Sequence, residues 1–354
     1  MNLKNLGWNE AFESSFNQYR VQGYTIGRVI LEHKRLYRVL TDQGELLAEV
    51  SGKFRFESLS RQAFPTVGDW VVVKPRWDEH KATIQAVLPR KSKFSRKVAG
   101  EKTEEQLVAT NIDVLFIVVA LNHDFNVRRI ERYMVMAWES GAKPVIILNK
   151  ADLCLNPEDK LKEVESVALG VKIHILSAVN EESIPLLQQY ATNGATVALV
   201  GSSGVGKSTI TNRLMGKEVQ YTQEVRDGDD RGRHTTTYRE LMILPTGGCI
   251  IDTPGMRELQ LWDAGESLQD VFEDIDHLSS MCFFANCSHK TEPKCAIKAA
   301  IDEGTLSQKR FQSYQKLQRE LAYLAQKEDK AAAIQKKVKT KSIHKELKKK
   351  INKR

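Results

Sequence analysis

Short apolar segments separated by turns dominate the first quarter of the chain, and residues 41–44 (Thr-Asp-Gln-Gly) have the composition of a tight turn. The segments that predict β-strands are 26–31, 37–40, 46–50, 70–74 and 82–88. Strands this close in sequence, mostly without a helical period between them, are typical of a small closed β-barrel. We expect an OB-type barrel, with an SH3-like barrel as the alternative.

The pattern changes after a basic connector at 90–97, which we expect to be either a solvated linker or a phosphate contact. Uninterrupted apolar runs then alternate with helical stretches at 127–140 and 157–169. Such runs are typical of strands buried in a parallel sheet. The predicted strands are 113–120, 145–148, 171–176, 197–200, 242–244 and 250–251. This alternation predicts a doubly wound α/β domain. After Pro254 the chain becomes helical.

A phosphate-binding motif follows the run at 197–200. Residues 201–208 are Gly-Ser-Ser-Gly-Val-Gly-Lys-Ser, which match G-x-x-x-x-G-K-[ST] in full and precede a predicted helix. The glycines let backbone N–H groups close around phosphates, and the helix N-terminus adds its positive dipole end. Lys207 can neutralise the β- and γ-phosphates, and the Ser208 hydroxyl can bind Mg²⁺. The motif predicts a nucleoside triphosphate with Mg²⁺.

The base is predicted by two further motifs. Asn149-Lys150-Ala151-Asp152 follows the strand at 145–148, and Ser177-Ala178 follows the strand at 171–176. A carboxylate such as Asp152 can accept two N–H bonds from the N1 and N2 edge of guanine, an edge that adenine lacks. The Lys150 stem can lie against the ring, and Asn149 can tie this loop to the phosphate loop. These motifs favour GTP over ATP.

A candidate switch ends the run at 250–251. Asp252-Thr253-Pro254-Gly255 would hold Mg²⁺ through water at Asp252 and contact the γ-phosphate at the Gly255 N–H. The polar loop at 231–237 is of the kind that orders on the γ-phosphate. Met256, which follows the switch glycine, cannot orient an attacking water, so intrinsic hydrolysis should be slow.

Five cysteines occur, and three of them cluster. Cys282, Cys287, His289 and Cys295 have the spacing C-x₄-C-x-H-x₅-C. Three thiolates and an imidazole form a closed tetrahedral donor set that suits one structural Zn²⁺. The other two cysteines, at 154 and 249, lie in or beside apolar strands and are predicted core residues.

The motifs occur in a rotated order, because the two guanine-side motifs precede the phosphate loop. A circular permutation has this effect, since it keeps the contacts and changes only which ends are joined. With its barrel, the segment Gly232-Arg233-His234-Thr235-Thr236-Thr237 and the cysteine cluster, the chain resembles the circularly permuted GTPase family RsgA, also called YjeQ, over nearly its whole length. Its Asp-Thr-Pro-Gly replaces the family's frequent Asp-Ser-Pro-Gly without chemical consequence.

The resemblance implies an OB-fold domain, binding to the 30S ribosomal subunit and its 16S rRNA late in assembly, and GTP hydrolysis stimulated by that subunit. It also implies that Thr236 joins Ser208 at Mg²⁺ and that His234 is the catalytic residue. The expected GTP-binding residues are Asn149, Lys150, Asp152, Ser177, Ala178, Gly201, Ser202, Ser203, Gly204, Val205, Gly206, Lys207, Ser208, Thr209, Thr236, Asp252 and Gly255.

The expected organisation is multidomain. An N-terminal extension and OB-type β-barrel occupy 1–95, the circularly permuted P-loop GTPase α/β domain 96–258, a helical zinc-binding domain 259–326 and a basic tail 327–354. Two other functions stay open: an RNA-binding module in which GTP is a structural clamp, and an ATP-using kinase, which the guanine motif disfavours.

Charge is concentrated in one segment. The chain has a formal net charge of +8, and residues 327–354 contain twelve Lys or Arg against three acids, so the tail alone carries +9. It is expected to be either a basic amphipathic helix or a disordered arm, and its role stays open. The N-terminus is polar, and no apolar run approaches the roughly 20 residues that span a bilayer. We expect a cytoplasmic monomer without membrane contact.

Overall fold

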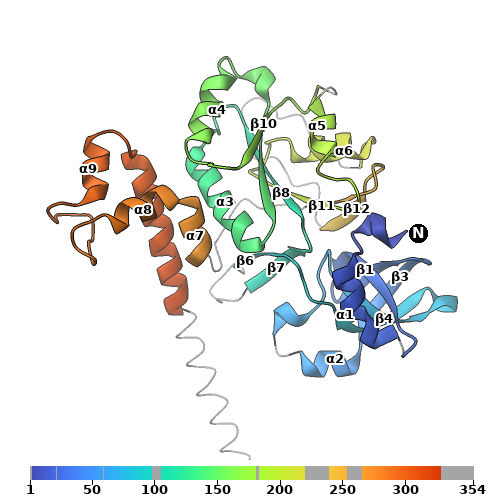
Figure 1. The fold of residues 1–354 in the computed structure, drawn as a ribbon. Coiled ribbons are helices and arrows are strands. Elements are labelled where there is room, and N and C mark those ends of the chain that lie inside the picture. Colours follow the sequence, from blue (N-terminus) through green and yellow to red (C-terminus); the bar gives the residue numbers. More distant parts are fainter. Residues whose placement is uncertain are drawn as a thin grey trace, which may run out of the picture. The chain divides into compact units, whose positions relative to one another are not determined.

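The computed structural model describes residues 2–20, 22–58, 60–97, 105–180, 183–219, 239–252 and 265–327. The chain divides into two compact units (Figure 1). One consists of 1–96 with 106–259, and the other of 97–105 with 260–354. The expected domain boundaries at 95, 258 and 326 stay predictions. Within the described ranges, every helix is too short or too polar to cross a bilayer.

The first unit begins with a closed five-stranded barrel in the described residues up to 97. Its strands are β1 (Thr25–His33), β2 (Leu36–Thr41), β3 (Gly44–Val50), β4 (Trp70–Arg76) and β5 (Lys81–Val87). They pair in the order β1-β2-β3-β5-β4, and β4 pairs back with β1 to close the barrel. Each strand ends within two residues of its predicted bounds. The OB-type barrel is therefore confirmed, and its core contains Val29, Val39, Leu46, Val71 and Ile84.

Several elements were not predicted. A 3-10 turn η1 (Leu3–Leu6) and helix α1 (Glu10–Arg20) precede the barrel, and α1 contacts β1 and β4 (Figure 1). Phe12 and Phe16 are buried, and the Trp8 ring lies 4.8 Å from that of Trp70, centroid to centroid. Aromatic packing of this kind holds the helix on the barrel. Helix α2 (Gly52–Glu57) and the 3-10 turns η2 (Arg61–Ala63) and η3 (Trp77–Glu79) lie between strands.

The basic connector at 90–97 is not a solvated linker. Arg90 pairs with the Asp69 carboxylate at 2.7 Å, and Phe94 is 1% exposed. Residues Lys93–Lys97 form β6, which pairs with the unpredicted strand β7 (Glu105–Thr110) in a small separate sheet. The linker alternative was wrong because the partner of Arg90 lies 21 residues earlier in the chain, where charge counting along the connector cannot detect it, and the phosphate contact stays a prediction.

The α/β part of the first unit has the predicted parallel sheet. Strands β8 (Val114–Ala120), β9 (Lys143–Asn149), β10 (Lys172–Ile175), β11 (Thr196–Val200) and β13 (Cys249–Asp252) are parallel in the order β10-β9-β8-β11-β13. Every residue of β8 and β11 is buried, as the uninterrupted apolar runs indicate. Strand β12 (Glu240–Ile243) is antiparallel to β13 and also pairs with β1 of the barrel.

Helices and short 3-10 turns connect these strands (Figure 1). Helix α3 (Val127–Ser140) has the predicted bounds, whereas α4 (Pro157–Glu165) ends four residues before the predicted 169. Gly170, in the left-handed region at φ 72°, completes the turn that follows α4. The remaining elements are η4 (Ala151–Leu153), α5 (Pro185–Gln188) and α6 (Lys207–Met215).

The second unit is helical, as predicted. It contains α7 (Gly265–Val271), α8 (Glu273–Ser280), α9 (Ala296–Asp302) and a helix over 308–327. Arg310, whose side chain is 6% exposed, pairs with Asp274 at 2.7 Å and lies 4.8 Å from the centroid of the Phe272 ring. This buried contact joins α8 to the last helix.

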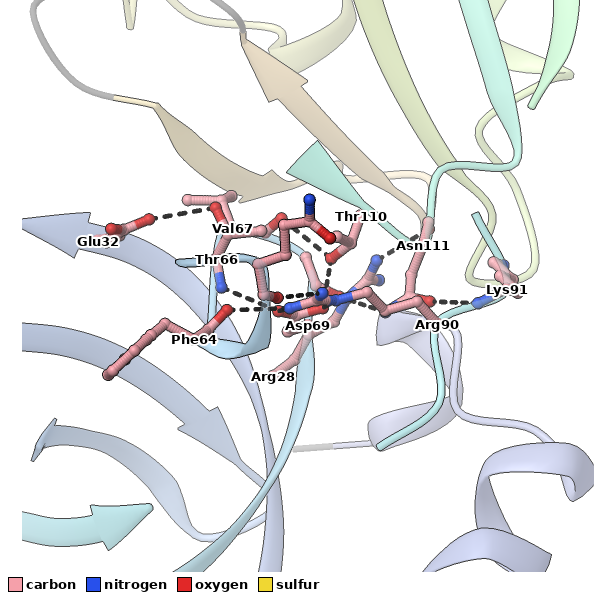
Figure 2. Close-up of polar contacts among 12 residues, drawn as sticks. Arg28, Glu32, Phe64, Thr66, Val67, Asp69, Arg90, Lys91, Thr110 and Asn111 are labelled. Atoms are coloured by element: carbon pink, nitrogen blue, oxygen red, sulfur yellow. Dashed lines mark hydrogen bonds and ion pairs between the residues drawn. The ribbon is translucent and has the colours of Figure 1, made fainter. Parts of the chain in front are cut away.

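A buried polar cluster joins the barrel to the segment that enters the α/β part (Figure 2). The Asp69 side chain is fully buried and accepts hydrogen bonds from Arg90 and from the Thr110 hydroxyl, each at 2.7 Å, and from the Thr66 N–H at 2.8 Å. Arg28, 1% exposed, donates to the carbonyls of Gly68 at 3.1 Å and Asn111 at 3.2 Å. The hydrogen-bond partners in this cluster therefore come mostly from different segments of the chain.

Removing the carboxylate at the centre of this cluster should be costly. We expect Asp69→Ala to lower the free energy of unfolding by about 3–5 kcal/mol, because Arg90 and Thr110 would lose a buried partner. Urea denaturation measures the loss. The control is Glu163→Ala, which breaks the exposed Lys160–Glu163 pair and should cost less than about 1 kcal/mol. An equally small effect of Asp69→Ala would show that the cluster does not hold the two parts together.

Candidate nucleotide and metal sites

The predicted nucleotide motifs meet at one edge of the sheet. Parallel strands β9, β10, β11 and β13 all present their carboxyl ends there, which is where open α/β sheets bind ligands. Asn149 ends β9, the phosphate loop follows β11, and Asp252 ends β13. Asp252 is 4% exposed and is paired in register with Leu199, two residues before the phosphate loop. Motifs far apart in the sequence are therefore neighbours in space.

The phosphate loop has the backbone geometry that its glycines predict. Gly201, Gly204 and Gly206 all have positive φ angles, and a Cβ at Gly201 would lie only 2.3 Å from the Val118 carbonyl oxygen. Helix α6 begins at Lys207. The Lys207 ammonium donates to the carbonyls of Gly201 at 2.8 Å and Ser202 at 2.6 Å. The loop carbonyls thus hold the cation beside the helix N-terminus, a favourable place for an anion.

The Asn149 side chain joins three loops. Its Nδ2 donates to the Val205 carbonyl at 2.8 Å, and its Oδ1 accepts from the Ala178 N–H at 2.9 Å. The residue is 2% exposed. A Cβ at Gly206 would lie 2.2 Å from Nδ2, so only glycine leaves room for the amide. This is the tie between the base loop and the phosphate loop that the sequence predicts.

The guanine-side loop presents its carboxylate to solvent. Asp152 is exposed, in the turn η4, and one of its oxygens accepts a hydrogen bond from the Ser177 hydroxyl. Lys150 has a left-handed backbone, with φ 61°, and the Ala151 N–H donates to Leu176 O at 3.2 Å. The two predicted guanine-side motifs therefore contact each other. Asn149 places both motifs beside the phosphate loop, because its side chain bonds to Val205 of that loop and to Ala178.

Other predicted residues fall into two groups. Ser203 lies in the phosphate loop, and Ser208 and Thr209 lie in the first turn of α6, as expected. His234, Thr236 and Gly255 lie outside the described residues, so their roles stay predictions.

Sequence reasoning missed a polar cluster beside the phosphate loop. Arg129 of α3 forms a two-pronged ion pair with Asp124, at 2.6 and 3.1 Å, and donates to the Ser202 hydroxyl. The hydrogen bond to Asp124 raises the pKa of Arg129 above its ordinary value. Tyr133, one turn later, is 2% exposed, and burial raises its pKa to about 12. The sequence offers one sign of Arg129 and Tyr133, which is their position in a helix that directly follows a buried strand.

The cysteine cluster has the geometry of a metal site. One ligand atom from each of Cys282, Cys287, His289 and Cys295 lies within 4.8 Å of all the others. The Cys282 and Cys295 sulfurs are 3.9 Å apart, close to the roughly 3.8 Å between tetrahedral thiolate ligands of a metal at about 2.3 Å. His289 Nδ1 faces these sulfurs, at 3.6 and 3.4 Å, and Nε2 lies 3.3 Å from the Ser279 hydroxyl. Such an outer contact is what orients a histidine ligand.

The fold and this edge define a circularly permuted P-loop GTPase, because the phosphate-loop strand β11 comes after the base-loop strand β9 in the chain. A sequence model of the RsgA GTPase family matches residues 87–262, and a model described as 50S ribosome-binding GTPase matches 196–330. The chain belongs to the RsgA GTPase family and is a GTP hydrolase.

Relatives match nearly the whole chain. The small ribosomal subunit biogenesis GTPase RsgA 2 of Lactiplantibacillus plantarum is 47% identical, over 91% of this chain and 90% of the relative. The corresponding RsgA of Opitutus terrae is 43% identical, over 94% and 93%. The crystal structure of YjeQ from Thermotoga maritima matches with a TM-score of 0.63 and 27% identity, over 84% of this chain and 99% of that one. YloQ, a circularly permuted GTPase, shares the fold, with a TM-score of 0.60 and 24% identity.

We expect the purified protein to hold one divalent metal per chain. Cys295→Ser should abolish this content, because a buried thiolate ligand is lost, and should lower the melting temperature of the second unit. Elemental analysis and calorimetry measure the two effects. Cys154→Ser is the matched control, since Cys154 is outside the cluster, and it should keep the metal. Full metal content in Cys295→Ser would contradict the assignment.

Proposed function

We propose that this chain acts in late maturation of the small ribosomal subunit, where it binds the 30S particle and its 16S rRNA and hydrolyses GTP to GDP and phosphate with subunit-stimulated turnover. The observation that carries this proposal is the extent of similarity to proteins named small ribosomal subunit biogenesis GTPase. The likeness spans about nine-tenths of both chains, and so includes the barrel and the metal-site unit as well as the nucleotide site.

The match to a 50S ribosome-binding GTPase model points to the other subunit, but it carries less weight. It covers residues 196–330, and so omits the barrel and the guanine-side motifs. Its first part, from the phosphate-loop strand to residue 259, reports features that GTPases with different partners share, and the rest falls in the second unit. The full-length relatives favour the small subunit.

The geometry of the sheet edge supports the roles of the described site residues, and the motifs and the family likeness supply those of His234, Thr236 and Gly255. Lys207 and the loop N–H groups bind the phosphates, Ser208 and Thr236 bind Mg²⁺, and Asp252 holds the ion through water. Asp152 accepts the guanine N–H groups, and the Gly255 N–H contacts the γ-phosphate. His234 orients the attacking water in place of Met256, which has no group that can do so.

We assign the metal as a single structural Zn²⁺. Three thiolates and an imidazole are the donors that Zn²⁺ prefers, and four protein ligands leave no open position for catalysis. The metal fixes the turn between α8 and α9, which otherwise has little core of its own. We further propose that the protein works as a cytoplasmic monomer, with GTP and the subunit as its ligands and without membrane contact.

Asp152→Asn tests the base-recognition role. The asparagine side chain offers one acceptor and one donor, so it suits xanthine, which has a carbonyl where guanine has its exocyclic amine. We expect GTP affinity to fall by roughly tenfold to a hundredfold and affinity for xanthosine triphosphate to rise. Competition with a fluorescent nucleotide measures both. Asp159→Asn, an exposed acid of α4, is the control and should keep GTP preference. Unchanged preference in Asp152→Asn would remove Asp152 from base recognition.

Phosphate release with small subunits, large subunits and neither tests the proposed partner. We expect turnover to be slow alone and to rise several-fold with small subunits only. His234→Ala should bind GTP normally and lose this stimulation, whereas Lys207→Ala should lose nucleotide binding. Stimulation by large subunits alone would overturn the small-subunit assignment. Negligible turnover in all three conditions would instead support an RNA-binding module with GTP as a structural clamp.

A further inference from the structure

Helix α3 reaches the phosphate loop through an arginine, Arg129. Arg129 is fixed by two hydrogen bonds to the Asp124 carboxylate, at 2.6 and 3.1 Å, and its Nη1 also donates to Ser202 Oγ. A two-pronged pair of this kind fixes the plane of a guanidinium as well as its position. The start of the helix is itself fixed, because the Asn126 side chain accepts the Arg128 N–H at 2.9 Å.

The Ser202 hydroxyl has a second partner on the same helix. Tyr133, one turn after Arg129, is hydrogen-bonded to Ser202. Asp124, Arg129, Tyr133 and Ser202 line one small cavity together with Val118 and Val205. Val205 is the phosphate-loop residue whose carbonyl Asn149 holds. The cluster therefore supports the first half of the loop, while Asn149 supports the second half.

The backbone of Ser202 faces the phosphate-binding side. Its carbonyl accepts from Lys207 Nζ at 2.6 Å, and the Gly201 carbonyl accepts from the same ammonium at 2.8 Å. Three glycines with positive φ make this loop intrinsically free to adopt other conformations. A side-chain anchor at Ser202 restricts that freedom, and it keeps in place the carbonyls that hold Lys207.

We propose that Arg129 is a positioning residue for nucleotide binding: by anchoring Ser202 from α3, it preorganises the phosphate loop and its Lys207 for the β- and γ-phosphates. The proposal rests on the assigned role of the phosphate loop. Preorganisation lowers the cost of binding and is common to GTP and GDP, so it acts on affinity. A nucleotide without a β-phosphate gains little from Lys207, and so gains little from Arg129.

The test measures nucleotide affinity in the full-length protein. We expect Arg129→Gln to weaken binding of both GDP and GTP by about tenfold, the lower end of the usual value of a hydrogen bond to a charged group, and to raise KM with kcat nearly unchanged. GMP affinity, measured by competition, should stay within about twofold of the starting protein. Arg132→Ala, which removes an arginine from the same helix outside this cluster, should leave all three affinities unchanged.

A double-mutant cycle separates positioning from a general effect on folding. Ser202→Ala alone should weaken GDP binding at least as much as Arg129→Gln, because it removes the contacts to both Arg129 and Tyr133, and the double variant should show no loss beyond that of Ser202→Ala. Ser202→Ala replaces one side chain in the loop, and so keeps the test valid if the arginine variant fails to fold. Additive losses, an equal loss for GMP, unchanged GDP affinity, or a fall in kcat alone would each overturn the proposal. Failure of GDP and GTP binding in Lys207→Ala tests the assigned phosphate loop separately.

Discussion

The side-chain amide of Asn149 is the interaction on which the nucleotide site depends. One donor and one acceptor on the same rigid group hold the loops after β10 and β11 against the end of β9. Burial strengthens these hydrogen bonds. It also makes both partners necessary, because a buried amide that lost them could not bond to water instead. The same crowding requires glycine at 206. A single residue thus links the loops proposed to recognise the base to the phosphate loop.

Contacts of this kind explain why the permuted chain order is tolerated. Asn149 precedes its partners in this chain, but a hydrogen bond between two sheet-edge loops does not depend on which loop comes first. What must be preserved is the parallel order β10-β9-β8-β11-β13, since it alone determines which strand ends are neighbours. Permutation places the new chain entry before β8, at Thr110 and Asn111, and this is where the barrel is attached through Asp69 and Arg28.

The sequence predicted those parts of the molecule whose signals are local. Alternating or apolar runs predicted the barrel strands, the glycine pattern predicted the phosphate loop, and the cysteine spacing predicted the metal cluster. All three features are present in the structure. Elements that depend on distant partners were missed. From the sequence alone Arg90 resembles a linker residue, because its partner Asp69 belongs to another segment. Helix α1 shows only two phenylalanines, and the rings that cover them, Trp70 on Phe12 and Trp8 on Phe16, are seen only in the structure. Arg129 belongs to no motif, and its contact to Ser202 spans 73 positions of sequence.

The barrel and the nucleotide site are also joined more directly than through a linker. Leu31 of β1 pairs with Glu240 of β12, and Glu240 pairs with Asp252 of β13, so the three residues lie in one row across neighbouring strands. Two strand spacings amount to about 10 Å. Arg38 of β2 adds an ion pair to Glu240 at 3.2 Å. A displacement of β12 and β13 at the end that carries Asp252 must therefore move β1 or break its pairing. Strand β1 is also paired with β2 and β4, so the closed barrel is connected to the Asp252 end of β13 through directly neighbouring strands.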